Sequence, residues 1–140
     1  MFKDRLIELM SEKNIKANKL SKEIDTSESV ISDWKKGKVM PKLDKALKLR
    51  QFFNCSLDYL FNNIEYEDIS NTKQTTTFDI QLKKILKDKK IAQTKMIDDL
   101  NLSNANLHRW FKMNDTPTME TIVKIADYLN VSIDYLVGIE

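Results

Sequence analysis

Several residue types are scarce in this chain, and each scarcity narrows the range of folds and functions. Two glycines and two prolines in 140 residues supply too few tight turns for a β-sandwich or β-barrel. The single cysteine, Cys55, excludes an intrachain disulfide, and we expect it to be a small core residue. With one histidine, no glycine-rich loop and no metal-ligand spacing, we expect no enzyme, no cofactor and no metal site.

Long apolar runs are missing as well. No stretch of about 18 apolar residues occurs, so we expect no membrane span, and the N-terminal MFKDRLIELM lacks the apolar core of a signal peptide. These absences favour a cytoplasmic protein. The net charge is only +2, so charge alone does not indicate a nucleic-acid partner, and no feature indicates a small-molecule ligand.

The chain does contain an internal repeat. An offset of 76 residues, the separation of Trp34 and Trp110, also aligns Phe2 with Phe78 and the string N-x-S-x-D-Y-L at 54–60 with its copy at 130–136. Identities this widely spread in one register indicate a duplicated domain. We therefore predict two domains, residues 1–63 and 78–140, joined by a linker over residues 64–77.

The linker is rich in serine, threonine and asparagine and lacks a helical period. Its first half alternates the apolar residues Ile64, Tyr66 and Ile69 with polar ones. That alternation predicts either a short strand or a segment docked on a domain.

Each repeat reads as five short helices, so the predicted fold class is all-α. The first repeat places them at about 2–13, 17–24, 28–36, 43–53 and 57–61, with apolar residues at helical spacing in the first. Ser27 and Ser103 stand where they would cap the third helix of each repeat. Gly37 is suited to the left-handed C-cap, and in the second repeat Asn114 is the better candidate than Met113.

Together these features resemble the phage Cro and repressor type of helix-turn-helix domain, often called the XRE family. In the first repeat the matching residues are Leu20, Ser27, Ile31, Ser32, Trp34, Gly37, Pro41, Phe53, Cys55, Ser56, Asp58 and Leu60. In the second they are Gln93, Ser103, Leu107, Trp110, Pro117, Leu129, Val131, Ser132, Asp134 and Leu136. The resemblance implies lambda-repressor-like domains whose third helix enters the major groove of double-stranded DNA, while the second helix points its N-terminus at a phosphate.

The resemblance also assigns site residues. The base-reading positions are Asn104, Ala105, His108 and Arg109 in the second repeat, and Glu28, Ser29, Ser32 and Asp33 in the first. Gln93 opens the second helix at the phosphate position of the second repeat, where the first has Ala17. Further phosphate contacts are predicted at Lys95, Lys112, Lys16, Lys19, Lys35, Lys36, Lys38 and Lys42.

Two function classes remain open from the sequence. The first is a sequence-specific transcription regulator, a repressor of the phage or mobile-element type, acting as a covalent pseudo-dimer or as a homodimer. The second is a protein-interaction module, such as an antitoxin or an antagonist of another repressor, because Glu28 and Asp33 make the third helix of the first repeat acidic.

Overall fold

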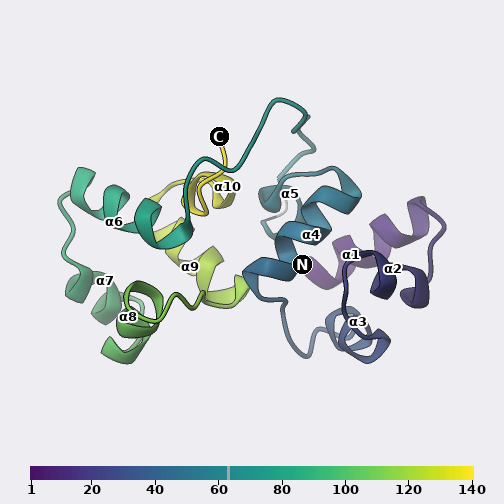
Figure 1. Cartoon of the computed structure of the whole chain (residues 1–140), viewed down its shortest axis with the longest axis horizontal. Coiled ribbons are helices and arrows are strands. Elements are labelled where there is room, and N and C mark those ends of the chain that lie inside the picture. Colours follow the sequence, from purple (N-terminus) through teal and green to yellow (C-terminus); the bar gives the residue numbers. More distant parts are fainter. Residues whose placement is uncertain (63) are drawn as a thin grey trace. The chain divides into compact units, whose positions relative to one another are not determined.

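The computed structural model describes residues 1–62 and 64–140, and within these ranges the elements are helices and no sheet is formed. The chain divides into two compact units, Met1–Ser70 and Asn71–Glu140. Figure 1 labels the five helices of each unit. The prediction of an all-α fold with two repeated five-helix domains is therefore confirmed. The predicted end of the first domain, residue 63, lies outside the described residues.

The first unit is built around its first helix. Its helices are α1 (Phe2–Glu12), α2 (Ala17–Glu23), α3 (Glu28–Lys35), α4 (Leu43–Phe53) and α5 (Leu57–Phe61). Helix α1 packs against α3 and α5, while α2 packs on α3 and α4 on α5. The ring of Phe2 meets Trp34 edge-on at 6.4 Å and stacks on Phe61 at 4.5 Å. One aromatic cluster thus joins the first, third and fifth helices.

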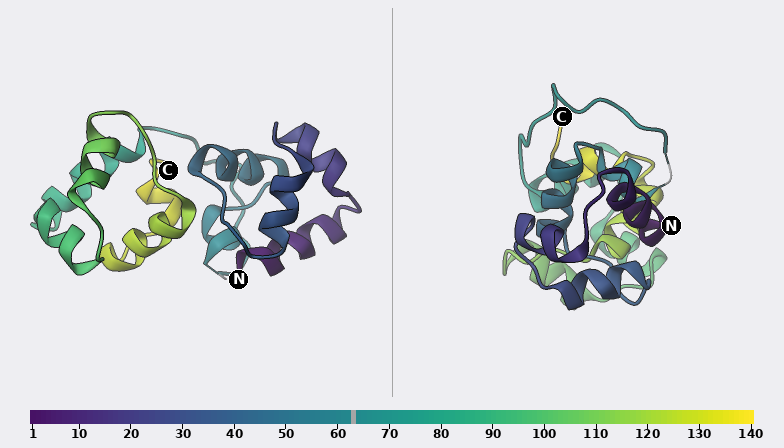
Figure 2. Two further views of the ribbon diagram at one scale, coloured as in Figure 1. Left: turned by 90° about the horizontal axis from the view of Figure 1, so that it is seen from below. Right: turned by 90° about the vertical axis from the view of Figure 1, so that its right-hand side faces the viewer.

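The second unit repeats this plan. Its helices are α6 (Phe78–Asp88), α7 (Gln93–Asp99), α8 (Asn104–Phe111), α9 (Met119–Leu129) and α10 (Ile133–Leu136). Helix α10 packs on α6 and α9, and α7 packs on α8. Figure 2 shows that both units consist of short helices joined by loops. Phe78 meets Trp110 edge-on at 5.8 Å. This contact is the counterpart of the Phe2–Trp34 pair, as the repeat predicts.

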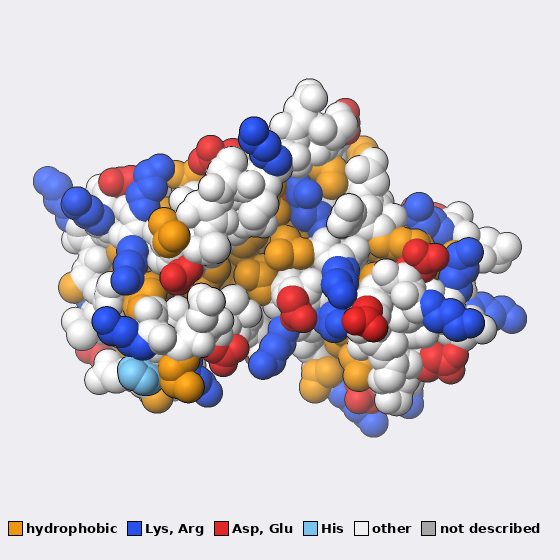
Figure 3. All heavy atoms as spheres, in the orientation of Figure 1, with side chains coloured by type: hydrophobic (Ala, Val, Ile, Leu, Met, Phe, Trp, Pro, Cys, Tyr) orange, Lys and Arg blue, Asp and Glu red, His pale blue; other side chains and the backbone are white. Residues whose placement is uncertain are grey.

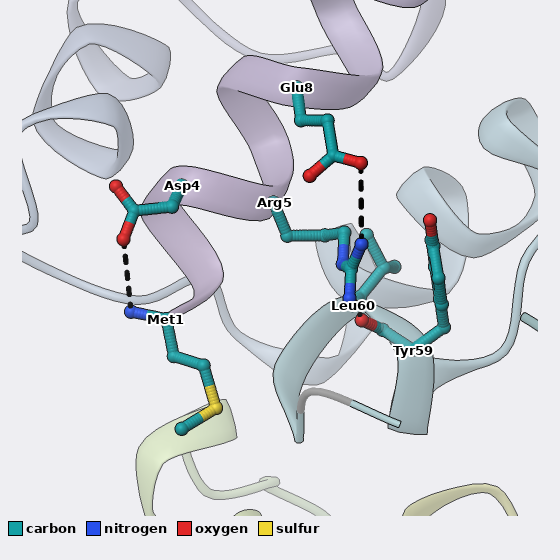
Figure 4. A pocket seen from close by; sticks show the side chains of 6 residues that line it. All are labelled: Met1, Asp4, Arg5, Glu8, Tyr59 and Leu60. Atoms are coloured by element: carbon teal, nitrogen blue, oxygen red, sulfur yellow. Dashed lines mark hydrogen bonds and ion pairs between the residues drawn. The ribbon is translucent and has the colours of Figure 1, made fainter. Parts of the chain in front are cut away.

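A second contact shared by the units ties the first helix to the fifth. In the first unit the Arg5 guanidinium donates through Nε to the Tyr59 carbonyl at 3.1 Å and lies over the Tyr59 ring. Figure 4 shows this cluster, in which Glu8 also pairs with Arg5 at 3.5 Å. In the second unit Gln81, at the position of Arg5, donates to the Tyr135 carbonyl at 2.8 Å. The bond therefore holds the domain together without needing the charge of an arginine.

The predicted caps are found, with one difference between the units. The Ser27 hydroxyl accepts from the Val30 N–H at 3.2 Å. In the second unit the Asn106 side chain instead accepts from both the backbone N–H and the hydroxyl of Ser103, at 2.9 and 2.8 Å. Both arrangements fix the first turn of the third helix of a unit.

The segment that follows α5 is docked and is not a strand over residues 64–69. The Tyr66 ring meets the Tyr59 ring edge-on at 5.7 Å, and Ile69 is only 8% exposed. Of the two structures that the alternation of apolar residues allowed, the docked segment is the one observed. Ile64, in contrast, is exposed.

Candidate nucleic-acid interface

The exposed face of the third helix in each unit is set by helical periodicity. Helix α8 buries Trp110 against the core, and residues on the opposite face of the helix reach solvent. All four predicted base-reading residues of this helix are exposed: Asn104, Ala105, His108 and Arg109. They follow the spacing i, i+1, i+4, i+5, which places them along one stripe.

Helix α3 presents the equivalent stripe in the first unit, opposite its buried residues Ile31 and Trp34. Glu28 and Ser29 are exposed, whereas Ser32 and Asp33 are half-buried. Six of the eight predicted base-reading residues are therefore exposed, and two are half-buried. The stripe on α3 is the less accessible of the two.

A shallow hollow of about 640 Å³ opens beside the stripe on α3. Its wall includes Ile7 of α1, which is 43% exposed. The hollow brings the predicted base-reading residues Glu28, Ser29 and Ser32 together with the predicted phosphate contacts Lys35 and Lys36, and Ala17 completes the lining. The lysines at 16, 19, 38 and 42 do not line it.

The second unit carries different chemistry at the positions equivalent to this hollow. Lys83 stands at the position of Ile7, and Phe111 stands at the position of Lys35. The Lys83 ammonium lies 4.7 Å from the centre of the Phe111 ring, a cation–π contact that packs the lysine stem against α8. A cation from the first helix is thus held beside the base-reading stripe of the second unit.

Lys83 was not predicted as a site residue from the sequence. Its nearness to α8 depends on how the first helix packs against the third, which the spacing of residues within each helix does not reveal. The available signal was the exchange between repeats, in which Ile7 and Lys35 become Lys83 and Phe111. Two positions whose side chains are in contact tend to change together, as these two do between the repeats.

The two equivalent surfaces differ in charge. On the stripe and hollow of the first unit, Glu28 and Asp33 balance Lys35 and Lys36. The equivalent positions of the second unit carry three cations and no acid: Lys83, Arg109 and Lys112. On the face that Figure 3 shows, the blue and red side chains are interspersed.

The predicted phosphate contacts occupy the ends of helices and their loops. In the first unit Lys16 is the N-cap of α2 and Lys42 the N-cap of α4, and both are exposed. Lys19, Lys36, Lys38, Lys95 and Lys112 are also exposed, while Lys35 and Gln93 are half-buried. The exposed side chains among them are available to DNA.

Lys95 is already engaged within its own unit. It pairs with Asp99 one turn along α7 at 3.1 Å, and the Tyr128 hydroxyl of α9 donates to the same carboxylate at 2.5 Å. The hydrogen bond from Tyr128, followed by that from Lys95, holds the pKa of the Asp99 carboxyl below its ordinary value. The same bond to Asp99 raises the pKa of the Tyr128 hydroxyl. Because Asp99 stays charged near neutral pH, Lys95 is in part neutralised there.

The turn that ends the third helix also differs between the units. Gly37 has a φ of +74°, and the Lys38 N–H donates to the Asp33 carbonyl at 2.9 Å. In the second unit Asn114 takes the left-handed conformation with a φ of +58°, which confirms it as the capping residue. The Asp115 N–H then donates to the Arg109 carbonyl at 3.0 Å. The turn after α8 is therefore one residue longer than the turn after α3.

Comparisons with known protein families agree with this geometry. A model described as a helix-turn-helix matches residues 6–60, and a model described as a Cro/C1-type HTH DNA-binding domain matches residues 81–140. The two matches together cover most of the chain, which belongs to the Cro/C1-type helix-turn-helix family as a tandem pair of domains. It is a DNA-binding protein of the transcription-regulator class, whose members are not typically enzymes.

Individual proteins and solved structures were compared with the chain as well. No curated protein matches the chain. A crystal structure of a transcriptional regulator from Listeria innocua has 15% sequence identity and a TM-score of 0.44, covering 92% of this chain and 94% of that chain. No helix in the described part of the chain combines the length and apolarity needed to cross a membrane.

Proposed function

We propose that the chain is a repressor of the phage or mobile-element type, which reads operator DNA with α3 and α8. In this proposal α8 supplies most of the base recognition. The observation that carries the proposal is a contrast in charge between the units: Lys83, Arg109 and Lys112 lie on or beside the α8 stripe, whereas acids and lysines balance at the equivalent positions of the first unit. Cations near the stripe are attracted to phosphates, whereas Glu28 and Asp33 are repelled by them.

The side chains on α8 match the chemistry of base edges in the major groove. Arg109 can make two hydrogen bonds to guanine, and Asn104 can make two to adenine. Ala105 is small enough to pack on a thymine methyl group, and His108 can donate to a base or a phosphate. The carboxylates of α3 have one suitable partner, the cytosine N4 amino group.

Two fused units supply what many single-domain relatives obtain by dimerisation. A helix-turn-helix dimer reads two half-sites about 34 Å apart on one face of the duplex. Because the two stripes in this chain differ, a single chain would read two unlike half-sites, and the operator would be asymmetric. The predicted cytoplasmic location would place the chain in the same compartment as bacterial or phage DNA.

The direct test is selection of bound duplexes from a random DNA pool by the full chain. We expect enrichment of a site with two unlike halves, one of them containing guanine and adenine positions suited to Arg109 and Asn104. Affinity for this site should fall steeply with salt, because phosphate contacts release counterions. A pool that remains random after repeated rounds would contradict sequence-specific operator binding.

The role of the first unit can be tested at Lys35, Lys36 and Lys38, which end α3 and begin the following loop. If these lysines contact the DNA backbone, each one neutralised should lower the log–log salt slope by about 1. The measurement is the affinity of the Lys→Gln triple variant for the selected site across a salt series. An unchanged slope would mean that these lysines do not contact DNA.

That outcome would favour the second candidate function, in which the first unit binds a protein. The hollow beside α3 supports this alternative because it exposes Ile7 next to the acidic residue Glu28. The discriminating variant is Ile7→Lys, which copies Lys83 of the second unit. Tighter DNA binding by this variant would place the hollow against DNA, whereas unchanged DNA binding would leave it available to a protein.

A further inference from the structure

The residues before α6 pair through antiparallel backbone hydrogen bonds with the last residues of the second unit. Residues 73–76, which we call the strap, lie against residues 138–140, and Figure 1 shows the C-terminal end beside this segment. The pairing is centred on an antiparallel bridge between Gln74 and Ile139. Its hydrogen bonds run from the Lys73 N–H to the Glu140 carbonyl at 2.8 Å, from the Glu140 N–H to the Lys73 carbonyl at 3.0 Å, and from the Thr75 N–H to the Gly138 carbonyl at 2.7 Å.

Gly138 is the residue that allows the strap to lie so close. Its φ is +91°, a conformation that other residues rarely adopt, and a Cβ built there would lie 2.2 Å from the Thr76 carbonyl oxygen. Asn62 stands at the equivalent position of the first unit and has a φ of −128°. The glycine therefore accompanies the strap and is not a general feature of the repeated domain.

The other end of the predicted linker is held by the first unit. The Tyr66 ring packs edge-on against Tyr59, which itself lies over the Arg5 guanidinium at 3.8 Å. Close behind, the Ser70 N–H and hydroxyl both donate to the Asp68 carboxylate at 3.0 Å, which fixes a tight local turn. Both ends of the linker are thus absorbed into structured units.

We propose that the strap sets the spacing between the two DNA segments that one chain can read. This inference rests on the proposed function, and it assigns control of the half-site spacing to the strap. Between Tyr66 and Lys73 lie six residues, which reach about 20 Å at ~3.3 Å each. The predicted linker of residues 64–77 would instead reach about 45 Å. A connection this short restricts the operator to a narrow range of half-site spacings.

Release of the strap should widen that range. If residues 73–77 detach, the connection grows by five residues and its reach by about 17 Å. The longer connection also lowers the effective concentration of one unit at the second half-site, by about two- to threefold. Strap variants should therefore bind the best-spaced operator slightly more weakly, and misspaced operators relatively better.

The test compares full-length variants on the selected duplex and on duplexes with inserted base pairs between the half-sites. Gly138→Ala forces a Cβ into the strap, and Thr75→Pro removes the N–H that donates to Gly138 without changing the second unit's core. Asn62→Ala is the matched control in the first unit. Loss of the strap is verified by amide hydrogen exchange at Lys73 and Glu140, which keep their N–H groups in both variants, and folding by the fluorescence of the buried Trp34 and Trp110.

Two base pairs inserted between the half-sites increase their separation along the duplex by about 7 Å and rotate one relative to the other by about 70°. The wild-type chain and Asn62→Ala should lose at least tenfold in affinity on this duplex, while the strap variants lose less than threefold. If Gly138→Ala unfolds the second unit, Thr75→Pro alone decides the comparison. Strap variants that lose amide protection but keep the wild-type spacing dependence would overturn this inference. Failure of the wild-type chain to bind any duplex would overturn the proposed function instead.

Discussion

At the scale of single residues, one equivalent position separates the two units most sharply: Arg109 in α8 and Asp33 in α3. Arg109 is exposed and lies on the base-reading stripe. Replacing Arg109 by alanine should cost ~1–3 kcal/mol of binding free energy on the selected duplex, because a bidentate contact to guanine would be lost. Folding stability should change little, since an exposed side chain away from caps and core contributes little.

The measurement is fluorescence anisotropy on the selected duplex and on a random duplex of equal length. Asp33→Ala is the matched control, and it should bind both duplexes as well as the wild type or better, because it removes an anion near phosphates. An equal loss on both duplexes for Arg109→Ala would indicate that this side chain contacts only the DNA backbone.

At the scale of elements, α7 and α9 of the second unit are linked by the hydrogen bond from Tyr128 to Asp99. The lowered pKa of Asp99 means that the folded state favours the carboxylate. Its stabilising contribution is fully present above the ordinary aspartate pKa of ~3.9 and is lost as pH falls through the lower folded pKa. Tyr128 has the opposite sign: its raised pKa makes its contribution present below about pH 10 and lost as pH rises further.

We therefore expect Tyr128→Phe to raise the pKa of Asp99 toward its ordinary value. The first unit has phenylalanine, Phe52, at the equivalent position, so the substitution is compatible with the fold. The measurement is an NMR titration of the Asp99 carboxyl carbon in the full chain. Lys95→Gln should raise this pKa by less, because the Tyr128 bond is the larger cause. A larger rise in the lysine variant would reverse that order.

Also at the element scale, the sequence predicts most helices because their signals are local. The bounds of α4, Leu43–Phe53, match the prediction at both ends, and α9, Met119–Leu129, lies at the same positions after the offset of 76. A preceding proline and an apolar stripe mark each helix. The left-handed cap at Asn114 was predictable for the same reason: asparagine tolerates positive φ better than the neighbouring methionine.

Other features depend on contacts between distant segments. The strap pairs backbone groups of residues 73–76 with those of residues 138–140, and backbone pairing leaves no side-chain pattern to read. Gly138 is the one sequence signal for this pairing, and a single glycine near a helix end is normally interpreted as a helix cap. The hollow beside α3 likewise requires Ile7 of α1 to lie near α3. The sequence predicted which residues point outward but not which helices frame the stripe.

At the scale of the whole molecule, the question is whether one chain or two occupy an operator. In the proposed pseudo-dimer, binding of one unit holds the other at millimolar effective concentration, which strengthens binding by 10²–10⁴-fold. We therefore expect one chain per selected duplex, measured by native mass spectrometry or sedimentation of the complex.

We also expect a fragment of residues 71–140, the second compact unit, to bind the same duplex at least about 100-fold more weakly. Its folding must first be verified by the fluorescence of Trp110, because domains of this size are marginally stable. A folded fragment that binds the full operator as tightly as the whole chain would exclude the pseudo-dimer. A complex with two full chains per duplex would instead indicate self-association, in which each chain contacts DNA mainly through the more cationic α8.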